Sequence, residues 1–382
     1  MKYLQISIEE LGAKLELSTF ATENGTTEWH TMLHVEPRGD MFQEQFHRIK
    51  QAEEVLMGMP EMEGAEIVFK RYFLSDSTNQ QPLMPEKDEH QRCAISYIQQ
   101  PPLDGSKVAL WLYIQKGMSI KHLPDSTIAT HNGYNHIWTM GLMDNHGDSY
   151  QQTQTLLTNY EEILTQQDAT IADNCLRTWF FVRDVDTQYH GLVVARREYF
   201  NHIGLTADTH YISSTGIGGN PSDPKALVQL GAYAVTGFMS EQQKYLYAPT
   251  HLNRTSDYGV TFERGTLMQY GDRNHAYISG TASIDNKGEV VHIGDIKKQT
   301  MRMWENVEKL LEEGGMTMEH CAQIIVYLRD TADYAVVSKM FEERFPGIPT
   351  VITLAPVCRP TWLIEMECIA IKENSNPQYP AY

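Results

Sequence analysis

The segment LIEMECIAI, residues 363–371, carries two carboxyl groups at a spacing that could support acid catalysis. Its alternating pattern predicts a β-strand, and side chains two residues apart on a strand share a face, so Glu365 and Glu367 would point the same way. A carboxyl group in a closed cleft can have its pKa raised by desolvation and can then donate a proton near neutral pH. Glu365 is therefore a candidate catalytic residue; the alternative is that both glutamates face solvent.

A cysteine and several cationic or polar groups could complete such a site. Cys358 stands seven positions before Glu365 and beside Arg359, whose charge would favour the reactive thiolate; the alternative is a small buried apolar residue. Arg177 begins an otherwise apolar run, and an arginine can bind a carboxylate through two parallel hydrogen bonds. A structural salt bridge is the alternative for Arg177. The remaining candidates for binding a substrate are Arg359, Arg264, Tyr211 and Ser283.

The glycine-rich stretch STGIGG, residues 214–219, could bind an anion through its backbone. Asn220 and Pro221 follow at once, so the stretch does not open a helix as a dinucleotide-binding loop would, and it lacks the lysine of a P-loop. Backbone N–H groups near Thr215, Gly216 and Gly218 could instead meet a carboxylate. A plain hairpin turn is the alternative.

One sequence pattern occurs three times along the chain, and its helices and strands must position the candidate site residues. Each copy has the end of an amphipathic helix, a short polar connection and a β-branched or aromatic run typical of a buried strand. The copies are EEVLMGMPEMEGAEIVFKRYFLSD, EEILTQQDATIADNCLRTWFFVRD and EKLLEEGGMTMEHCAQIIVYLRD. Aligning the closing strands makes Gln229 the equivalent of Glu365. Only the third repeat therefore has an acid at this position. If Gly204 and Gly347 are equivalent, the residues eleven positions after each of them, Thr215 and Cys358, are equivalent too.

The repeats predict an α+β fold in which helices cover one face of each sheet. We expect a divergent N-terminal repeat at residues 1–125 and a middle repeat at 126–240. A linker at 241–271, a C-terminal repeat at 272–373 and a flexible tail at 374–382 complete the predicted organisation.

The third repeat, from about His275 to Lys372, resembles the YjgF/Rid superfamily through ISGTASID, NVEKLLEEGGMTMEHCAQIIVYLRD and IEMECIAI. Three single-domain subunits form a trimer in that superfamily, with ligand sites in the clefts between them. The resemblance therefore implies that the three repeats of this chain form a pseudo-trimer. The deaminase branch carries an arginine where Val351 and Ile352 stand here, so imine deamination by that mechanism is not expected.

The last two thirds of the chain also resemble the chorismatases. The matching pieces are RTW at 177–179, TGIGG at 215–219, F-x-R at 262–264, SGTASI at 279–284 and CRPTWLIEME at 358–367. This resemblance implies hydrolysis of the enolpyruvyl ether of chorismate, or of a similar dicarboxylate, with release of pyruvate. It implies that Glu365 is the general acid, in a cleft between the second and third repeats, and that Cys358 shapes the outcome. The alternatives are a small-molecule-binding protein without turnover and a ribonuclease.

The amino-acid composition limits the ligands and partners that the protein is expected to bind. Across 382 residues the formal net charge is -18, which disfavours nucleic-acid binding and argues against the ribonuclease alternative. We expect a small anionic carboxylate substrate, no cofactor and no metal, because the five scattered cysteines and the histidines show no ligand spacing. Without a signal peptide or an apolar run of about 18 residues, a cytoplasmic protein with no membrane partner is expected. A fused chain also predicts a monomer or a weak homo-oligomer.

Overall fold

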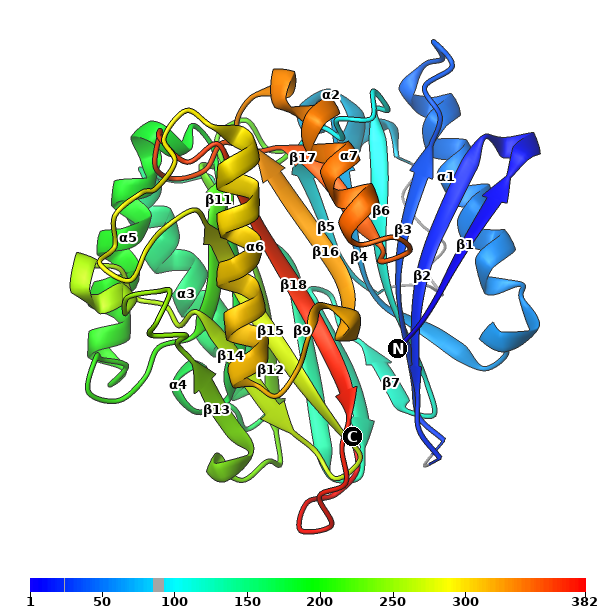
Figure 1. The fold of residues 1–382 in the computed structure, drawn as a ribbon. Helices are drawn as coiled ribbons and strands as arrows, with labels where there is room; N and C mark the ends of the chain where they lie inside the picture. The colour runs from blue at the N-terminus through cyan, green and yellow to red at the C-terminus, as the bar shows by residue number, and fades with distance from the viewer. Residues whose placement is uncertain (24, 85–92) are drawn as a thin grey trace.

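Three six-stranded sheets with the same strand order make up the chain (Figure 1). The computed structural model describes residues 1–23, 25–84 and 93–382. In each sheet a three-stranded antiparallel meander continues into the closing strand of the unit. A further strand pairs antiparallel with that closing strand, and the edge strand pairs parallel with this further strand.

Unit one spans residues 2–116, and its sheet has the order β1-β2-β3-β6-β4-β5. Its elements are β1 (Lys2–Ile8), β2 (Ala13–Ala21), β3 (Thr27–Val35), α1 (Phe42–Met57), β4 (Ala65–Leu74), α2 (Ser77–Gln80), β5 (Ala94–Gln99) and β6 (Val108–Lys116). The long helix α1 packs on the outer face of this sheet, burying Phe46, Ile49 and Leu56.

Unit two spans residues 119–236, with the order β11-β10-β12-β9-β8-β7. Its elements are β7 (Ser119–His122), β8 (Ser126–His131), β9 (Tyr134–Met143), α3 (Ser149–Thr165), α4 (Ile171–Asn174), β10 (Cys175–Val182), α5 (Val185–His202), β11 (Ser213–Gly218) and β12 (Val228–Thr236). Asp148 caps α3 by accepting a 2.9 Å hydrogen bond from the backbone N–H of Gln151, which fixes where the helix begins.

Unit three spans residues 243–373, with the order β13-β14-β15-β18-β16-β17. Its elements are β13 (Gln243–Leu246), β14 (Gly265–Gln269), β15 (Arg273–Ala282), α6 (Ile296–Glu313), β16 (Cys321–Leu328), α7 (Tyr334–Arg344), β17 (Thr350–Leu354) and β18 (Ile364–Glu373). Short 3-10 helices within the described residues are η1 (Glu9–Leu11), η2 (Pro60–Met62), η3 (Gln81–Leu83), η4 (Ser240–Gln242), η5 (Thr255–Tyr258), η6 (Met318–His320) and η7 (Thr331–Asp333). None of the described helices combines the length and the apolarity needed to cross a lipid bilayer.

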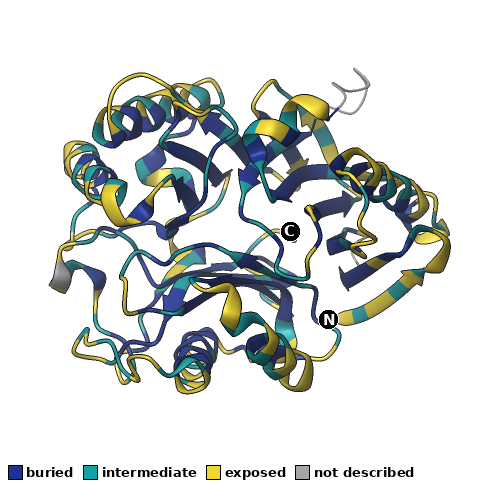
Figure 2. Cartoon of the chain, turned by 90° about the horizontal axis from the view of Figure 1, so that it is seen from above, coloured by how far each residue is buried: buried dark blue, intermediate teal, exposed yellow. Residues whose placement is uncertain are grey.

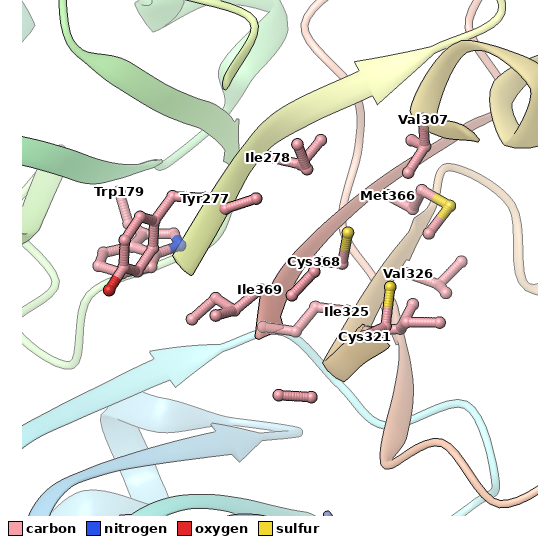
Figure 3. Close-up of a cluster of buried hydrophobic side chains, with 14 of the residues drawn as sticks. Trp179, Tyr277, Ile278, Val307, Cys321, Ile325, Val326, Met366, Cys368 and Ile369 are labelled. Carbon is pink, nitrogen blue, oxygen red and sulfur yellow. The ribbon is translucent and has the colours of Figure 1, made fainter. Parts of the chain in front are cut away.

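The inner faces of the three sheets pack together, and the helices cover the outer faces. Viewed from above, the sheets surround a common centre (Figure 2). Trp111 of β6, Trp179 of β10 and Tyr277 of β15 belong to one buried cluster, although each comes from a different unit. Phe180, which points the other way from Trp179, packs instead with the residues under α3 and α5. Figure 3 shows part of the shared cluster, in which Trp179 of β10 and Tyr277 of β15 appear together with residues of β16 and β18.

The predicted α+β architecture of three repeats is confirmed, because each helix-strand pattern in the sequence forms the same pair of elements. The closing-strand alignment is also right: Gln229 pairs with Phe181 of its own unit just as Glu365 pairs with Tyr327. The alignment of Thr215 with Cys358 is wrong. Ser214 pairs with Thr178, and Thr350 pairs with the corresponding Ile324, so the counterpart of Thr215 is Val351. The count failed because β11 begins nine positions after Gly204, whereas β17 begins only three positions after Gly347.

Three predicted boundaries also differ from the structure. Residues 119–122 form β7, which belongs to the second sheet and not to the N-terminal repeat. The predicted linker 241–271 contains β13 and β14 of the third sheet; these strands are four and five residues long, too short for a clear alternating pattern. The predicted flexible tail ends in Tyr382, whose side chain is only 1% exposed.

Candidate functional site

A cavity of about 370 Å³ lies between units two and three. Helix α5 and strand β11 form its wall on one side, and β15, β18 and two loops of unit three form the other. The lining residues include Asp186, Tyr189, His190, Arg196, Ser214, Gly216, Phe262, Arg264, Gly280, Cys358, Arg359, Trp362 and Glu365. The structure thus brings five of the predicted site residues together: Glu365, Cys358, Arg264, Arg359 and Gly216.

Glu365 reaches this cavity from the start of β18, where the strand is buried on both faces. Its side chain is 5% exposed, and it pairs with Ala282 of β15 and Tyr327 of β16. Burial raises the pKa of Glu365 to about 8, the charge of Glu367 adds to the rise, and Arg177 and Arg264 partly oppose it. At neutral pH the group is therefore a carboxylic acid that faces a cavity, as a proton donor requires.

Glu367, two residues along the same strand, is bound as a carboxylate by unit two. Arg177 donates to it at 2.9 Å, the indole N–H of Trp179 at 2.7 Å and the hydroxyl of Thr215 at 2.6 Å. Arg177 itself is 1% exposed and does not line the cavity. The structure therefore shows the alternative interpretation of Arg177, a structural salt bridge, and places both Arg177 and Thr215 behind the cavity wall.

Three guanidinium groups give the cavity a positive lining. Arg264 is oriented by hydrogen bonds to the backbone carbonyl and the side-chain oxygen of Asn253, at 3.2 and 3.1 Å. Arg196 donates to Thr261 at 3.2 Å and to Ser214 at 3.3 Å. Arg359 lies over the ring of Trp362, with its Cζ 4.6 Å from the centroid. In a chain with a net charge of -18, this local charge favours an anionic ligand.

Cys358 lines the same cavity, but as a thiol. Burial and the nearby Glu365 raise the pKa of Cys358 to about 12, against the smaller lowering effects of Tyr189 and Arg359. The expectation that Arg359 would favour a thiolate is wrong, because desolvation outweighs one neighbouring cation. A neutral thiol beside Glu365 can shape the cavity or donate a weak hydrogen bond.

The stretch STGIGG is a strand and not a loop, since β11 pairs in parallel with β10. Gly216 faces the cavity, where a side chain at this position would collide with the ring of Tyr189. Gly218 lies farther along and donates its N–H to the carbonyl of Pro356 at 2.9 Å, so this group is not directed at the cavity. Of the glycines predicted to bind a carboxylate, only Gly216 lines the cavity.

Two further candidates also lie outside the lining. Tyr211 is 7% exposed, and its ring stacks against Phe200 under α5. The hydroxyl of Ser283 donates to the carbonyl of Val291 at 2.8 Å, while the carbonyl of Ser283 accepts from the indole of Trp362. Ser283 therefore supports the wall that Trp362 forms.

The sequence interpretation missed Arg196 and Gly280. Arg196 falls four residues after Leu192 and four before Phe200, both buried on the same stripe of α5, and that spacing was a usable signal. Gly280 sits at an irregularity in the pairing of β15 with β18. A methyl group there would overlap Oε1 of Glu365 and lie 3.1 Å from Cγ2 of Thr215, so glycine makes room for the acid.

Within the described residues, no three His, Cys, Asp or Glu side chains cluster closely enough to hold a metal ion.

Comparison with known proteins relates unit three to a family and most of the chain to a known fold. Residues 268–372 match the family described as Endoribonuclease L-PSP. Over 103 residues the chain is 38% identical to a RutC family protein of Pyrococcus abyssi and 37% identical to one of Pyrococcus horikoshii. These alignments cover 26% of this chain and 80% and 81% of those proteins. A crystal structure of a chorismatase has a similar fold, with a TM-score of 0.64 at 17% identity, over 82% of this chain and 96% of that one.

Proposed function

Because the chain belongs through unit three to the YjgF/Rid superfamily, and its fold is like that of a chorismatase, we propose that it hydrolyses the enolpyruvyl ether of chorismate or of a similar dicarboxylate. One observation carries the proposal. Glu365, a buried carboxyl group whose pKa is raised to about 8, faces a cavity lined by three arginines. A proton donor is thereby placed where an anionic substrate would bind.

The cavity suits a substrate with two carboxylates and an apolar ring. Arg264 and Arg196 enter from opposite walls, and Arg359 lies near the loop of Cys358. Each guanidinium can meet a carboxylate through parallel N–H groups. The rings of Phe262, Tyr189 and Trp362 supply the apolar surface between them.

The reaction then needs one acid and one water. The Glu365 carboxyl gives its proton to the terminal methylene carbon of the enol ether, and the π electrons form the new C–H bond. The resulting oxocarbenium carbon is attacked by water, which returns a proton to the Glu365 carboxylate. In the collapse of the hemiketal, its hydroxyl group becomes the carbonyl of pyruvate and its proton passes to the ether oxygen. The bond between that oxygen and the former oxocarbenium carbon breaks, which releases pyruvate and the ring alcohol. Nearby cationic groups hold the substrate carboxylates during these steps.

The test is to incubate the purified protein with chorismate and to measure pyruvate continuously with lactate dehydrogenase and NADH. We expect pyruvate from the wild type and at least a 100-fold lower rate from Glu365→Gln, which keeps the size of the side chain but has no acidic proton. Glu16→Gln is the matched control, since Glu16 is a buried glutamate (7% exposed) at the interface of units one and three. Its rate should equal that of the wild type.

A wild type that releases no pyruvate above the Glu365→Gln background would overturn the hydrolase proposal. If chorismate then raises the melting temperature of both proteins equally, the chain is a binding protein without turnover.

A further inference from the structure

Arg71 of β4 lies in the interior between the three sheets, outside the candidate active site. The residue is fully buried, with 0% exposure. Within the described residues, its Nε and both terminal nitrogens have no hydrogen-bond acceptor, and no carboxylate lies within 4.0 Å. Burying a cation without an ion pair or hydrogen-bond acceptors costs free energy, so other groups must stabilise its charge.

The surroundings of Arg71 are aromatic. Its Cζ lies 4.8 Å from the ring centroid of Trp179, 5.0 Å from that of Phe181 and 5.1 Å from that of Trp111. Ring faces attract a cation, but a guanidinium also carries five N–H donors in its plane, and ring faces do not satisfy those donors in full. The aromatic enclosure therefore explains part of the stabilisation and leaves the donors in need of an acceptor.

Glu367, whose negative charge acts on Arg71, already pairs with another cation. Glu367 forms its salt bridge with Arg177 and accepts two further hydrogen bonds, from Trp179 and Thr215. Arg71 and Arg177 bring two positive charges to this interior, and Glu367 brings one negative charge. One net positive charge thus remains in a region closed to solvent.

Two neutral side chains on β16 add buried polar groups that have no hydrogen-bond partner among the described residues. The hydroxyl of Tyr327 and the side-chain amide of Gln323 are fully buried and have no hydrogen-bond partner in the described part of the chain. They lie four residues apart and so share the inner face of the strand. Tyr327 is close enough to Arg71 for the two groups to influence each other electrostatically. A guanidinium and a hydroxyl together form a donor set that suits an anion.

We propose that the interior between the three sheets binds one small monovalent anion, of about the size of chloride, through the N–H groups of Arg71 and the hydroxyl of Tyr327. The anion neutralises the excess charge and accepts the unpaired donors. Its site is separate from the cavity of Glu365, so it stabilises the fold and takes no part in the proposed hydrolysis.

The proposal is tested by thermal unfolding in sodium chloride against sodium gluconate at one fixed ionic strength, since gluconate is too large to enter. For the wild type we expect the melting temperature to rise by about 2 °C for each tenfold increase in chloride above its dissociation constant. Arg71→Met should abolish this dependence, and Tyr327→Phe should shift it to higher chloride. Crystals of the wild type grown in bromide should show an anomalous peak within hydrogen-bond distance of Arg71.

Ordered water alone beside Arg71 in the bromide crystals would overturn the proposal. So would equal melting temperatures of the wild type in chloride and gluconate. These two measurements need no variant, so they stand even if Arg71→Met does not fold.

Discussion

Glu365 and Glu367 are two residues apart on one strand, yet their surroundings differ sharply. Glu367 is surrounded by donors from unit two, while Glu365 faces the cavity beside Gly280. The charge of Glu367 helps to keep its neighbour protonated, because two nearby carboxylates resist joint ionisation. The division of roles between the two acids therefore comes from their partners and not from their positions on β18.

The first prediction concerns pH. The acid form of Glu365 is the proposed proton donor, and burial raises the pKa of Glu365 to about 8. The proposed activity should therefore be constant near neutral pH and decline as the pH rises through 8. The measurement is kcat/KM for pyruvate release between pH 4 and pH 9.5. A decline centred near the ordinary carboxyl pKa would contradict the assignment.

The second prediction concerns Glu367, which acts as a positioning residue. Glu367→Gln removes the negative charge that helps to raise the pKa of Glu365, so the alkaline decline should move to lower pH. The variant also leaves Arg177 buried without its ion pair, which should lower the free energy of unfolding by about 3–5 kcal/mol. A destabilised variant with an unchanged pH profile would show that Glu367 is structural only.

At the scale of elements, the site depends on how strands from two units approach each other. Strand β11 lies on the edge of its own sheet, and it contacts β15 of the next unit through the Thr215 hydroxyl, which accepts from the N–H of Gly280 at 2.9 Å. Helix α5 runs above β11 and carries Arg196 and Tyr189 to the same cavity. One edge strand and one helix thus supply the whole wall from unit two.

The third prediction tests this close approach. Gly280→Ala would place a methyl group on Oε1 of Glu365 and against Thr215, so the acid must move. We expect kcat/KM to fall by about 100-fold, as displacements near 1 Å can cause. Gly314→Ala is the matched control, because a methyl group there meets its neighbours only at 3.4 Å and beyond. Equal activity of the two variants would contradict the proposed geometry.

At the scale of the whole molecule, the last residue joins all three units. Tyr382 lies between their inner faces, at the end where Arg273 and Glu28 form a salt bridge of 2.7 Å. Its hydroxyl accepts from Gln115 of unit one at 2.6 Å, and its ring packs against His136 of unit two and His275 of unit three. The final residue of the segment that was predicted to be flexible is thus part of the core.

The fourth prediction follows from that position. Tyr382→Ala leaves a cavity among buried polar groups and removes contacts with every unit, so the free energy of unfolding should fall by about 3–5 kcal/mol. Tyr379→Ala, in the same segment but with a less buried side chain, should cost about 1 kcal/mol or less. Urea unfolding of both variants provides the comparison, and equal losses would contradict a specific role for Tyr382.

The sequence by itself determined the repeated architecture and singled out Glu365 as the candidate acid. Helix and strand periodicities are local, so they survive in each copy, and the closing strands align Glu365 with Gln229 correctly. Counting failed for Thr215 because the preceding loops differ in length, and loop length leaves no periodic signal.

Only the tertiary structure decided which charged groups meet. Arg177 and Arg196 both lie in unit two and both meet residues of unit three, but Arg177 pairs with Glu367 and Arg196 lines the cavity. Whether Cys358 is a thiol or a thiolate depended in the same way on burial between units. Electrostatic partners and desolvation act through space, between residues far apart in the chain, and a one-dimensional pattern holds no record of those distances.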